Sequence, residues 1–173
     1  MKTDTKRKSL KNLEFNAGDY VVYPTHGVGQ VTGVEEREIA GQDLQLFIIN
    51  FEKERMILRV PIDKVEDSGL RKLSSEKTIE MALKTLKGRV RSKRTMWSRR
   101  AQEYEAKINS GDPIAIAEVV RDLHRNADQP EQSYSERQMY QAALERLARE
   151  YAACEDLDHD TAVEMMEDSM SSS

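Results

Sequence analysis

The 173-residue sequence lacks several features that would indicate a particular environment or fold. It has one cysteine, Cys154, which excludes a disulfide framework and fits a reducing cytoplasm. Only 38% of the residues are hydrophobic, below the usual share, so small cores are expected in place of a single large one. No apolar run approaches the roughly 18 residues of a membrane-spanning helix. The basic N-terminus also lacks the apolar segment of a signal peptide.

The patterns that mark catalytic and metal sites are missing as well. The histidines have no metal-ligand spacing, since they lie far apart at His26, His124 and His159. Nucleophile-elbow, phosphate-loop and dinucleotide-binding glycine patterns are absent. The run Asp156-x-Asp158-x-Asp160 resembles a calcium loop, but Thr161 stands where that loop needs glycine for its turn. We therefore predict a protein that is not an enzyme and holds no metal or cofactor.

Charge is distributed unevenly along the chain, although its net value is only −4. Residues 71–110 carry 12 basic and 4 acidic side chains, a net charge of +8. Residues 15–70 carry a net charge of −5, and residues 155–173 contain 7 acidic side chains and no basic one. Such asymmetry indicates charged partners more than it indicates a fold.

The first part of the chain has the pattern of a small β module. Short runs rich in β-branched and aromatic residues are separated by turn signals, and these runs cover residues 21–23, 28–34, 44–51 and 56–60. We predict a strongly curved sheet or barrel, because closing the sheet protects its edges. Pro61 should end the fourth strand, since proline cannot donate to the hydrogen-bond ladder.

After the β module, the apolar period changes to that of helices. Hydroxyl or carboxylate N-caps precede two predicted helices, at Ser74-Ser75 and Asp112-Pro113, and the run Ser133-Tyr134-Ser135-Glu136 precedes another. A further helix should run from about Thr95 to Asn109. A short final helix is predicted around residues 160–168.

The segment Lys84–Arg100 contains eight basic residues, no acidic residue and the only tryptophan, Trp97. Phosphates attract such a run, and an apolar side chain among arginines suits a wedge in the minor groove of DNA. Two plainer interpretations stay open. Trp97 fits a helical apolar stripe with Tyr104 and Ile108, so spacing alone favours a core position. The basic run also fits a solvated helix face.

Three separated motifs carry a resemblance to a known family. Phe15-x-x-Gly-Asp-x-Val-Val-Tyr-Pro-x-His-Gly opens the β module, Arg59-Val-Pro closes its fourth strand, and Trp97-Ser-Arg-Arg ends the basic segment. With Ser110-Gly-Asp and Ala117-Glu-Val-Val-Arg-Asp-Leu, they resemble the CarD/CdnL-type bacterial transcription regulators over about residues 15–155. The β module alone is also similar to the polymerase-interacting domain of transcription–repair coupling factors. The helical half with its tryptophan distinguishes the two.

The resemblance implies an α+β fold, in which an N-terminal small Tudor/SH3-like β-barrel precedes a C-terminal all-α helical bundle. Together with the patterns above, it divides the chain into four parts. These are a basic arm expected to be disordered, a β module, a helical domain and an acidic, partly disordered tail, at residues 1–14, 15–70, 71–155 and 156–173.

The resemblance also implies two sets of contact residues. In the family, arginines from the second and fourth strands and an apolar neighbour contact the β subunit of RNA polymerase, and the matching positions are Arg37, Ile39 and Arg59. Arginine suits such an interface because its guanidinium pairs bidentately with carboxylates, although both arginines also fit ordinary exposed strand charges. The family's DNA-contacting positions, at the upstream edge of the melted promoter, correspond to Trp97, Arg99, Arg100 and Arg137. A lysine of the family is Gln102 here, which leaves one phosphate contact without a matching residue.

The resulting hypothesis is a cytoplasmic, monomeric and non-catalytic regulator that stabilises the promoter open complex. Its predicted partners are the RNA polymerase β subunit and promoter DNA, which it contacts at the minor groove and phosphates and binds weakly when alone; no membrane is involved. Two alternatives stay open. One is a polymerase-docking adaptor that recruits another protein without touching DNA. The other is a general nucleic-acid-binding protein that acts independently of polymerase.

Overall fold

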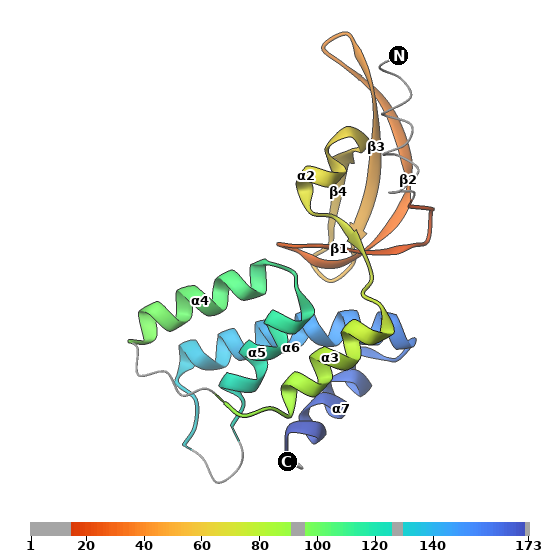
Figure 1. Ribbon diagram of the computed structural model, residues 1–173. Helices are drawn as coiled ribbons and strands as arrows, with labels where there is room; N and C mark the ends of the chain where they lie inside the picture. Colours follow the sequence, from red (N-terminus) through yellow and green to blue (C-terminus); the bar gives the residue numbers. More distant parts are fainter. Residues whose placement is uncertain (1–14, 91–95, 126–129, 172–173) are drawn as a thin grey trace. The chain divides into compact units, whose positions relative to one another are not determined.

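Residues 15–90, 96–125 and 130–171 are described by the structure, a computed structural model (Figure 1). The chain divides into two compact units between Lys72 and Leu73, close to the boundary predicted after residue 70. The first unit holds the strands and two short helical segments, and the described part of the second unit is helical. This confirms the predicted α+β class, a small Tudor/SH3-like β domain followed by an all-α bundle. The predicted arm at residues 1–14 lies outside the described residues.

The first unit is a five-stranded antiparallel sheet with the strand order β4-β3-β2-β1-β5. Its strands are β1 (Tyr20–Tyr23), β2 (Gly27–Ile39), β3 (Gln42–Phe51), β4 (Met56–Pro61) and β5 (Arg71–Lys72). The four predicted strands are present, and β4 ends at the proline that was expected to end it. The sequence pattern missed β5, which has only two residues. It also ended β2 too early, because charged residues fill the exposed outer half of that strand.

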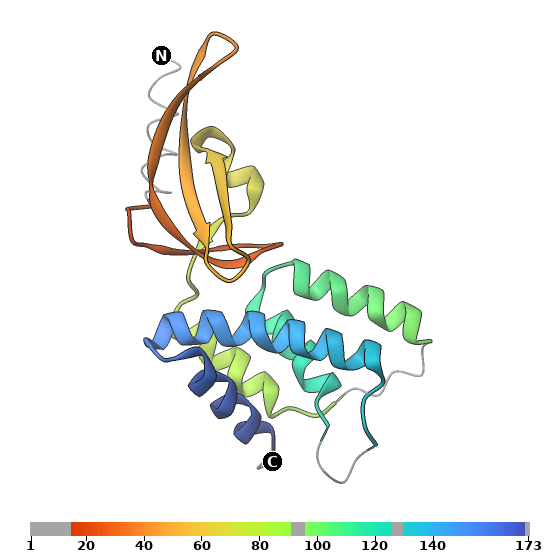
Figure 2. The same ribbon diagram turned by 180° about the vertical axis from the view of Figure 1, so that it is seen from behind.

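One face of the sheet provides most of the buried apolar cluster of the first unit. The 3-10 helix η1 (Ile62–Lys64) and helix α2 (Val65–Ser68) follow β4, and Figures 1 and 2 show α2 beside that strand. Helix α2 contributes the fully buried Val65 to this core. The other buried core residues are Phe15, Val21, Val31, Phe47, Ile49, Phe51, Val60 and Leu70.

The second unit contains five helices within the described residues: α3 (Glu76–Leu86), α4 (Trp97–Asn109), α5 (Pro113–Leu123), α6 (Tyr134–Glu155) and α7 (His159–Ser171). Three of these helices have side-chain N-caps, and the two caps that the sequence predicts, before α3 and α5, are confirmed in atomic detail. The Ser75 side chain accepts a hydrogen bond from the Thr78 amide, Asp112 caps Ile114, and Ser133 caps Glu136. These side chains satisfy amides that the helix itself leaves unpaired.

Helix α5 provides much of the core of the helical unit. It contacts α3, α4 and α6, and apolar side chains along it are buried, among them Ile116, Val119, Val120 and Leu123. Lys107 Nζ on α4 donates a 2.7 Å hydrogen bond to Glu118 Oε2 on α5, which adds a polar link between these helices. Because α5 is apolar on most sides, its neighbours arrange themselves around it.

The C-terminal segment contains the final helix that the sequence predicts around residues 160–168. This helix, α7, is longer than expected and spans His159–Ser171 within the predicted acidic, partly disordered tail at residues 156–173. Ala162, Met166 and Met170 recur at a spacing of four and are buried, and α7 packs against α6 and α3. The many acidic residues of the segment hide this narrow apolar stripe in a charge profile. The described part of the tail therefore belongs to the helical unit.

A glycine in β2 provides a test of the packing of the β module. A Cβ atom at Gly29 would lie 2.7 Å from Ile49 Cγ2 and 2.8 Å from Phe51 Cε1, whereas one at Gly33 would meet no atom within 4 Å. We expect Gly29→Ala to destabilise the β module by about 1–3 kcal/mol through overpacking. Gly33→Ala, the matched control, should cause no loss. Native-state hydrogen exchange of β2 and β3 amides measures both effects, with α5 amides as the internal reference. Equal exchange in the two variants would contradict this packing.

Candidate functional site

Glu35, Arg37 and Arg59 lie on one face of the sheet because of the strand register. Glu35 on β2 stands opposite Leu46 on β3, and Leu46 stands opposite Pro61 on β4. Residues two apart on a strand share a face, so Arg37 and Arg59 project on the same side as Glu35. Arg37 Nε donates a 2.6 Å hydrogen bond to Glu35 Oε1, and Arg59 Nε donates a 3.0 Å bond to Glu35 Oε2. One carboxylate thus holds both predicted docking arginines.

The two arginines remain accessible while Glu35 holds them. Their side chains are 49% and 41% exposed, and that of Glu35 is 29% exposed. The hydrogen bonds from Arg59 and Arg37 lower the pKa of Glu35 below its ordinary value of 4.5, so the carboxylate is ionised at neutral pH. The motif analysis missed Glu35. Its spacing of two from Arg37 was the available signal, but its contact with Arg59 depends on the pairing of three strands.

Ile39 is the third predicted docking residue, and strand alternation puts it on the same face as Arg37. It ends β2 opposite Gln42 and is 51% exposed. The turn that follows has positive φ at Ala40 and Gly41, which matches the twist of a tight hairpin. The structure therefore brings all three predicted positions to one face of the β module.

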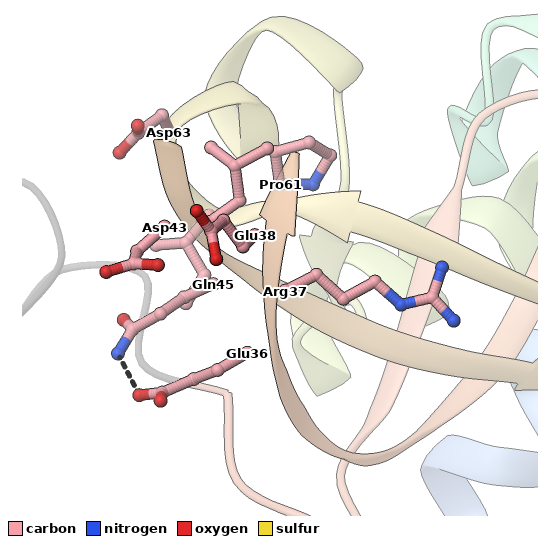
Figure 3. Close-up of a pocket in the computed structure, with 9 residues that line it drawn as sticks. Glu36, Arg37, Glu38, Asp43, Gln45, Pro61 and Asp63 are labelled. Atoms are coloured by element: carbon pink, nitrogen blue, oxygen red, sulfur yellow. Dashed lines mark hydrogen bonds between the residues drawn. The ribbon is translucent and has the colours of Figure 1, made fainter. Parts of the chain in front are cut away.

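A shallow hollow lies beside Arg37 at the hairpin end of the sheet (Figure 3). Four carboxylates line it, from Glu36, Glu38, Asp43 and Asp63. The guanidinium of Arg37 points away from the labelled carboxylates in this view. Gln45 Nε2 donates a 3.2 Å hydrogen bond to Glu36 Oε1. Across residues 15–90, 96–125 and 130–171, no group of three or more His, Cys, Asp or Glu side chains is placed to hold a metal ion.

Trp97, the predicted DNA-contacting residue, is the first residue of α4. Its ring is half-buried and packs against the core of the helical unit, with its centroid 6.3 Å from that of the buried Tyr104. Trp97 is therefore a partial member of the core and also keeps exposed surface. The two sequence interpretations, core residue and wedge, are both compatible with this position.

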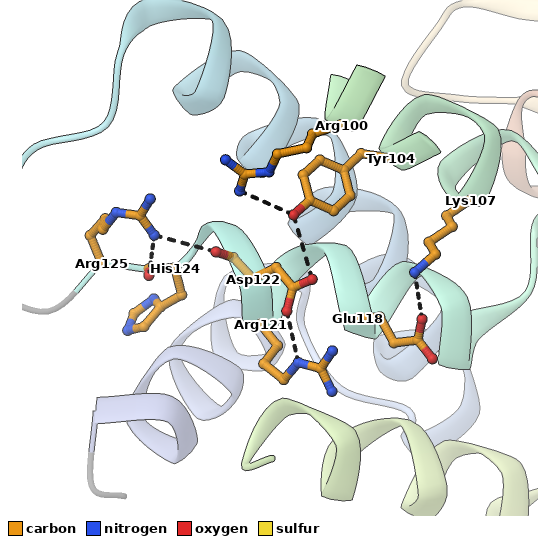
Figure 4. A network of polar contacts seen from close by, with 8 residues as sticks. All are labelled: Arg100, Tyr104, Lys107, Glu118, Arg121, Asp122, His124 and Arg125. Carbon is orange, nitrogen blue, oxygen red and sulfur yellow. Dashed lines mark hydrogen bonds and ion pairs between the residues drawn. The ribbon is translucent and has the colours of Figure 1, made fainter. Parts of the chain in front are cut away.

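The predicted basic residues differ in their surroundings. Arg99 is exposed on α4, and Arg137 is exposed in the first turns of α6. Arg100 is half-buried and donates a 3.3 Å hydrogen bond from Nη2 to the Tyr104 hydroxyl (Figure 4). Both ribbon views show the N-terminal ends of α4 and α6 at the same end of the helical unit. Three basic residues of the predicted run, Arg91, Lys93 and Arg94, fall outside the described residues.

Comparisons with known proteins assign both units. A family model described as the CarD-like/TRCF RID domain matches residues 15–74, and one described as the C-terminal domain of CarD matches residues 81–167. RID domains of this kind are RNA polymerase-interacting domains, and the CarD-like family is a family of transcription regulators. The chain belongs to the CarD-like family, as its sequence motifs predict.

Individual proteins are also similar to this chain. The chain is 29% identical over 136 residues to the putative transcription factor YdeB of Bacillus subtilis (strain 168), a match that covers 79% of this chain and 89% of YdeB. The solution NMR structure of the 72-residue N-terminal domain of Myxococcus xanthus CarD is 37% identical and covers 34% of this chain and 79% of its own, with a TM-score of 0.31. The structure of CdnLNt from Myxococcus xanthus is 41% identical to this chain. The match covers 36% of this chain and 89% of CdnLNt, with a TM-score of 0.32.

The described helices differ in length or hydrophobicity from a membrane-spanning helix. Within the described ranges, every helix is too short or too polar to cross a membrane.

The shared carboxylate predicts a defined acid response of the two arginines. Because the pKa of Glu35 is lowered in the folded protein, the contact is fully present above the ordinary pKa of 4.5 and is lost as the pH falls through the lowered value. NMR signals of the Nε–H groups of Arg37 and Arg59 should therefore shift together, with one midpoint below pH 4.5. Glu35→Gln should abolish this common transition. Separate midpoints for the two arginines would show that they do not share the carboxylate.

Proposed function

We propose that this protein binds the β subunit of RNA polymerase through the outer face of its β module. We also propose that it stabilises the promoter open complex through DNA contacts of its helical unit at the upstream edge of the bubble. The observation that carries the proposal is the joint placement of Arg37, Ile39 and Arg59 on one accessible face, where Glu35 holds the two arginines. The family assignment supports it, because the β module matches a polymerase-interacting domain.

The arginine pair suits docking on a protein surface. Each arginine uses Nε to bind Glu35, which limits the freedom of the side chain before a partner arrives. Ordering a long side chain in advance lowers the entropy cost of association. A planar guanidinium can also pair bidentately with a carboxylate of the partner, and Ile39 adds apolar contact area.

The end of the helical unit suits a weak contact with DNA. Trp97 has one part of its ring anchored on the core, as a side chain that inserts beside a base step requires. Arg99 and Arg137 are exposed near the N-terminal ends of their helices, where the helix dipole also favours phosphate. None of these contacts reads a base sequence, so this DNA binding tolerates many promoters.

The two units then act together on one equilibrium. Docking on polymerase raises the effective concentration of the helical unit at the promoter, which compensates for weak DNA binding by a protein of net charge −4. A regulator shifts the opening of DNA only if it binds the open and closed states with different affinity. Trp97 provides that difference, because its stacking partner is available only at an opened base step.

Reversal of one docking charge should abolish the contact with polymerase. Arg59→Glu removes a guanidinium and places a second carboxylate beside Glu35, and loss of such an interface charge costs about 2–5 kcal/mol, or roughly 30-fold or more in Kd. The measurement is co-purification of the full chain with RNA polymerase. Lys72→Glu makes the same charge change on β5 at the other edge of the sheet and should leave recovery unchanged. Normal recovery of Arg59→Glu would remove the docking assignment.

Removal of the tryptophan should affect promoter opening without affecting docking. Trp97→Ala loses a stacking contact of about 1–3 kcal/mol, so we expect open complexes to decay about fivefold faster or more. Their lifetime on a promoter fragment with RNA polymerase measures this effect. Met96→Ala is the matched control, because Met96 is the adjacent residue and is 76% exposed.

The same experiments separate the alternatives. Decay at the wild-type rate in Trp97→Ala, with docking intact, would indicate an adaptor without a DNA wedge. DNA binding that ignores both polymerase and Arg59→Glu would indicate a general nucleic-acid-binding protein.

A further inference from the structure

We propose that Arg100 is a positioning residue for Trp97 and does not contact phosphate, and that Tyr104 and Asp122 hold Arg100 in place. The proposal rests on the DNA role of Trp97 proposed above. It gives different roles to Arg99 and Arg100, the two adjacent arginines of the family motif.

Helical spacing puts the three side chains of α4 on one face. Trp97, Arg100 and Tyr104 follow one another at intervals of three and four residues, which brings their side chains together. The Cζ atom of Arg100 lies 5.7 Å from the centroid of each aromatic ring. Both distances are in the range of a favourable cation–π contact. The guanidinium therefore links the half-buried indole of Trp97 to a ring in the core.

A hydrogen-bonded chain then fixes Arg100 to α5 (Figure 4). The Tyr104 hydroxyl accepts from Arg100 Nη2 at 3.3 Å and donates to Asp122 Oδ2 over a longer 3.5 Å. Arg121 Nε donates a 3.0 Å hydrogen bond to Asp122 Oδ1. Tyr104 and Asp122 are only 3% and 5% exposed, so this chain is shielded from water. Shielding strengthens its electrostatic part.

Arg100 is poorly placed for a phosphate. Its Nε atom is buried and, within the described residues, has no hydrogen-bond partner, so this edge of the guanidinium faces protein. Binding of a phosphate through that edge would require Arg100 to leave both rings. Arg99, in contrast, is exposed and is the better candidate for a phosphate contact.

The first turn of α4 lacks a side-chain cap, so its order depends on other contacts. Its N-cap residue is Met96, whose side chain makes no capping hydrogen bond. An uncapped first turn frays readily, and Trp97 is its first residue. The contact with Arg100 reaches across that turn and restrains the ring. Trp97 would otherwise have to be ordered when it meets DNA, at a cost to its affinity.

The single tryptophan makes the test specific, because fluorescence of the full chain reports on Trp97 alone. We expect Arg100→Gln to increase quenching of Trp97 by acrylamide in the free protein. Open complexes should decay about threefold faster, as expected from the loss of a cation–π contact. Arg99→Gln, the matched control, should leave the quenching unchanged. Unchanged quenching in Arg100→Gln would overturn the proposal.

Salt dependence distinguishes positioning from phosphate binding. If Arg99 contacts a phosphate, Arg99→Gln lowers the log–log salt slope of binding to the polymerase–promoter complex by about 0.9. Arg100→Gln should leave that slope unchanged. A lowered slope in Arg100→Gln with normal quenching would identify Arg100 as a phosphate contact and contradict the proposal.

A second variant keeps the test valid if Arg100→Gln unfolds the helical unit. Tyr104→Phe retains the ring and removes only the hydroxyl, so it should increase Trp97 quenching while far-UV circular dichroism stays normal. Normal quenching in a folded Tyr104→Phe would contradict the role of the hydroxyl chain. Quenching of the free protein does not depend on DNA, so it tests this positioning even if Trp97→Ala leaves open complexes unaffected and the proposed function fails.

Discussion

The pairing of β2, β3 and β4 is the constraint on which the β module's proposed binding face depends. It sets Glu35, Arg37 and Arg59 on one side, and a shift of one residue would send one arginine to the opposite face. The hairpin turn at Ala40 and Gly41 helps to set that register through its two positive φ angles. Glu35 then converts two separate strand charges into one ordered group, because its carboxylate accepts from both arginines.

In the helical unit, packing between helices positions the proposed DNA-contacting residue, as strand pairing positions the arginines of the β module. Apolar α5 orients α4 by packing, and the start of α4 carries Trp97. A half-buried indole combines two requirements that oppose each other, since it must be held firmly and still offer surface to DNA. The link through Arg100 to Tyr104 holds the indole in place and still leaves part of its surface exposed. Order at this end of the unit thus comes from side-chain contacts, in place of the missing helix cap.

Much of the organisation could be predicted from local patterns. Alternating and helical apolar periods identified four strands and the helices, and Asp112 was recognised as a cap because capping needs only neighbouring residues. Motifs in the right order also identified the family. The final helix was predicted to be shorter, around residues 160–168, whereas α7 spans His159–Ser171 and buries a stripe of Ala162, Met166 and Met170. Its acidic composition described the exposed face of α7 and concealed the packed one.

The sequence by itself determined the class of fold, the family, the residues proposed to contact polymerase and DNA, and the segregation of charge behind a net value of −4. These features are local or additive along the chain, so they can be read without coordinates. Only the tertiary structure decided that Glu35 holds Arg37 and Arg59, that Trp97 is half-buried, and that Arg100 faces two rings while Arg99 is exposed. Each of these depends on which strand or helix packs beside another, and residues 24 apart, such as Glu35 and Arg59, carry no local signal of their contact.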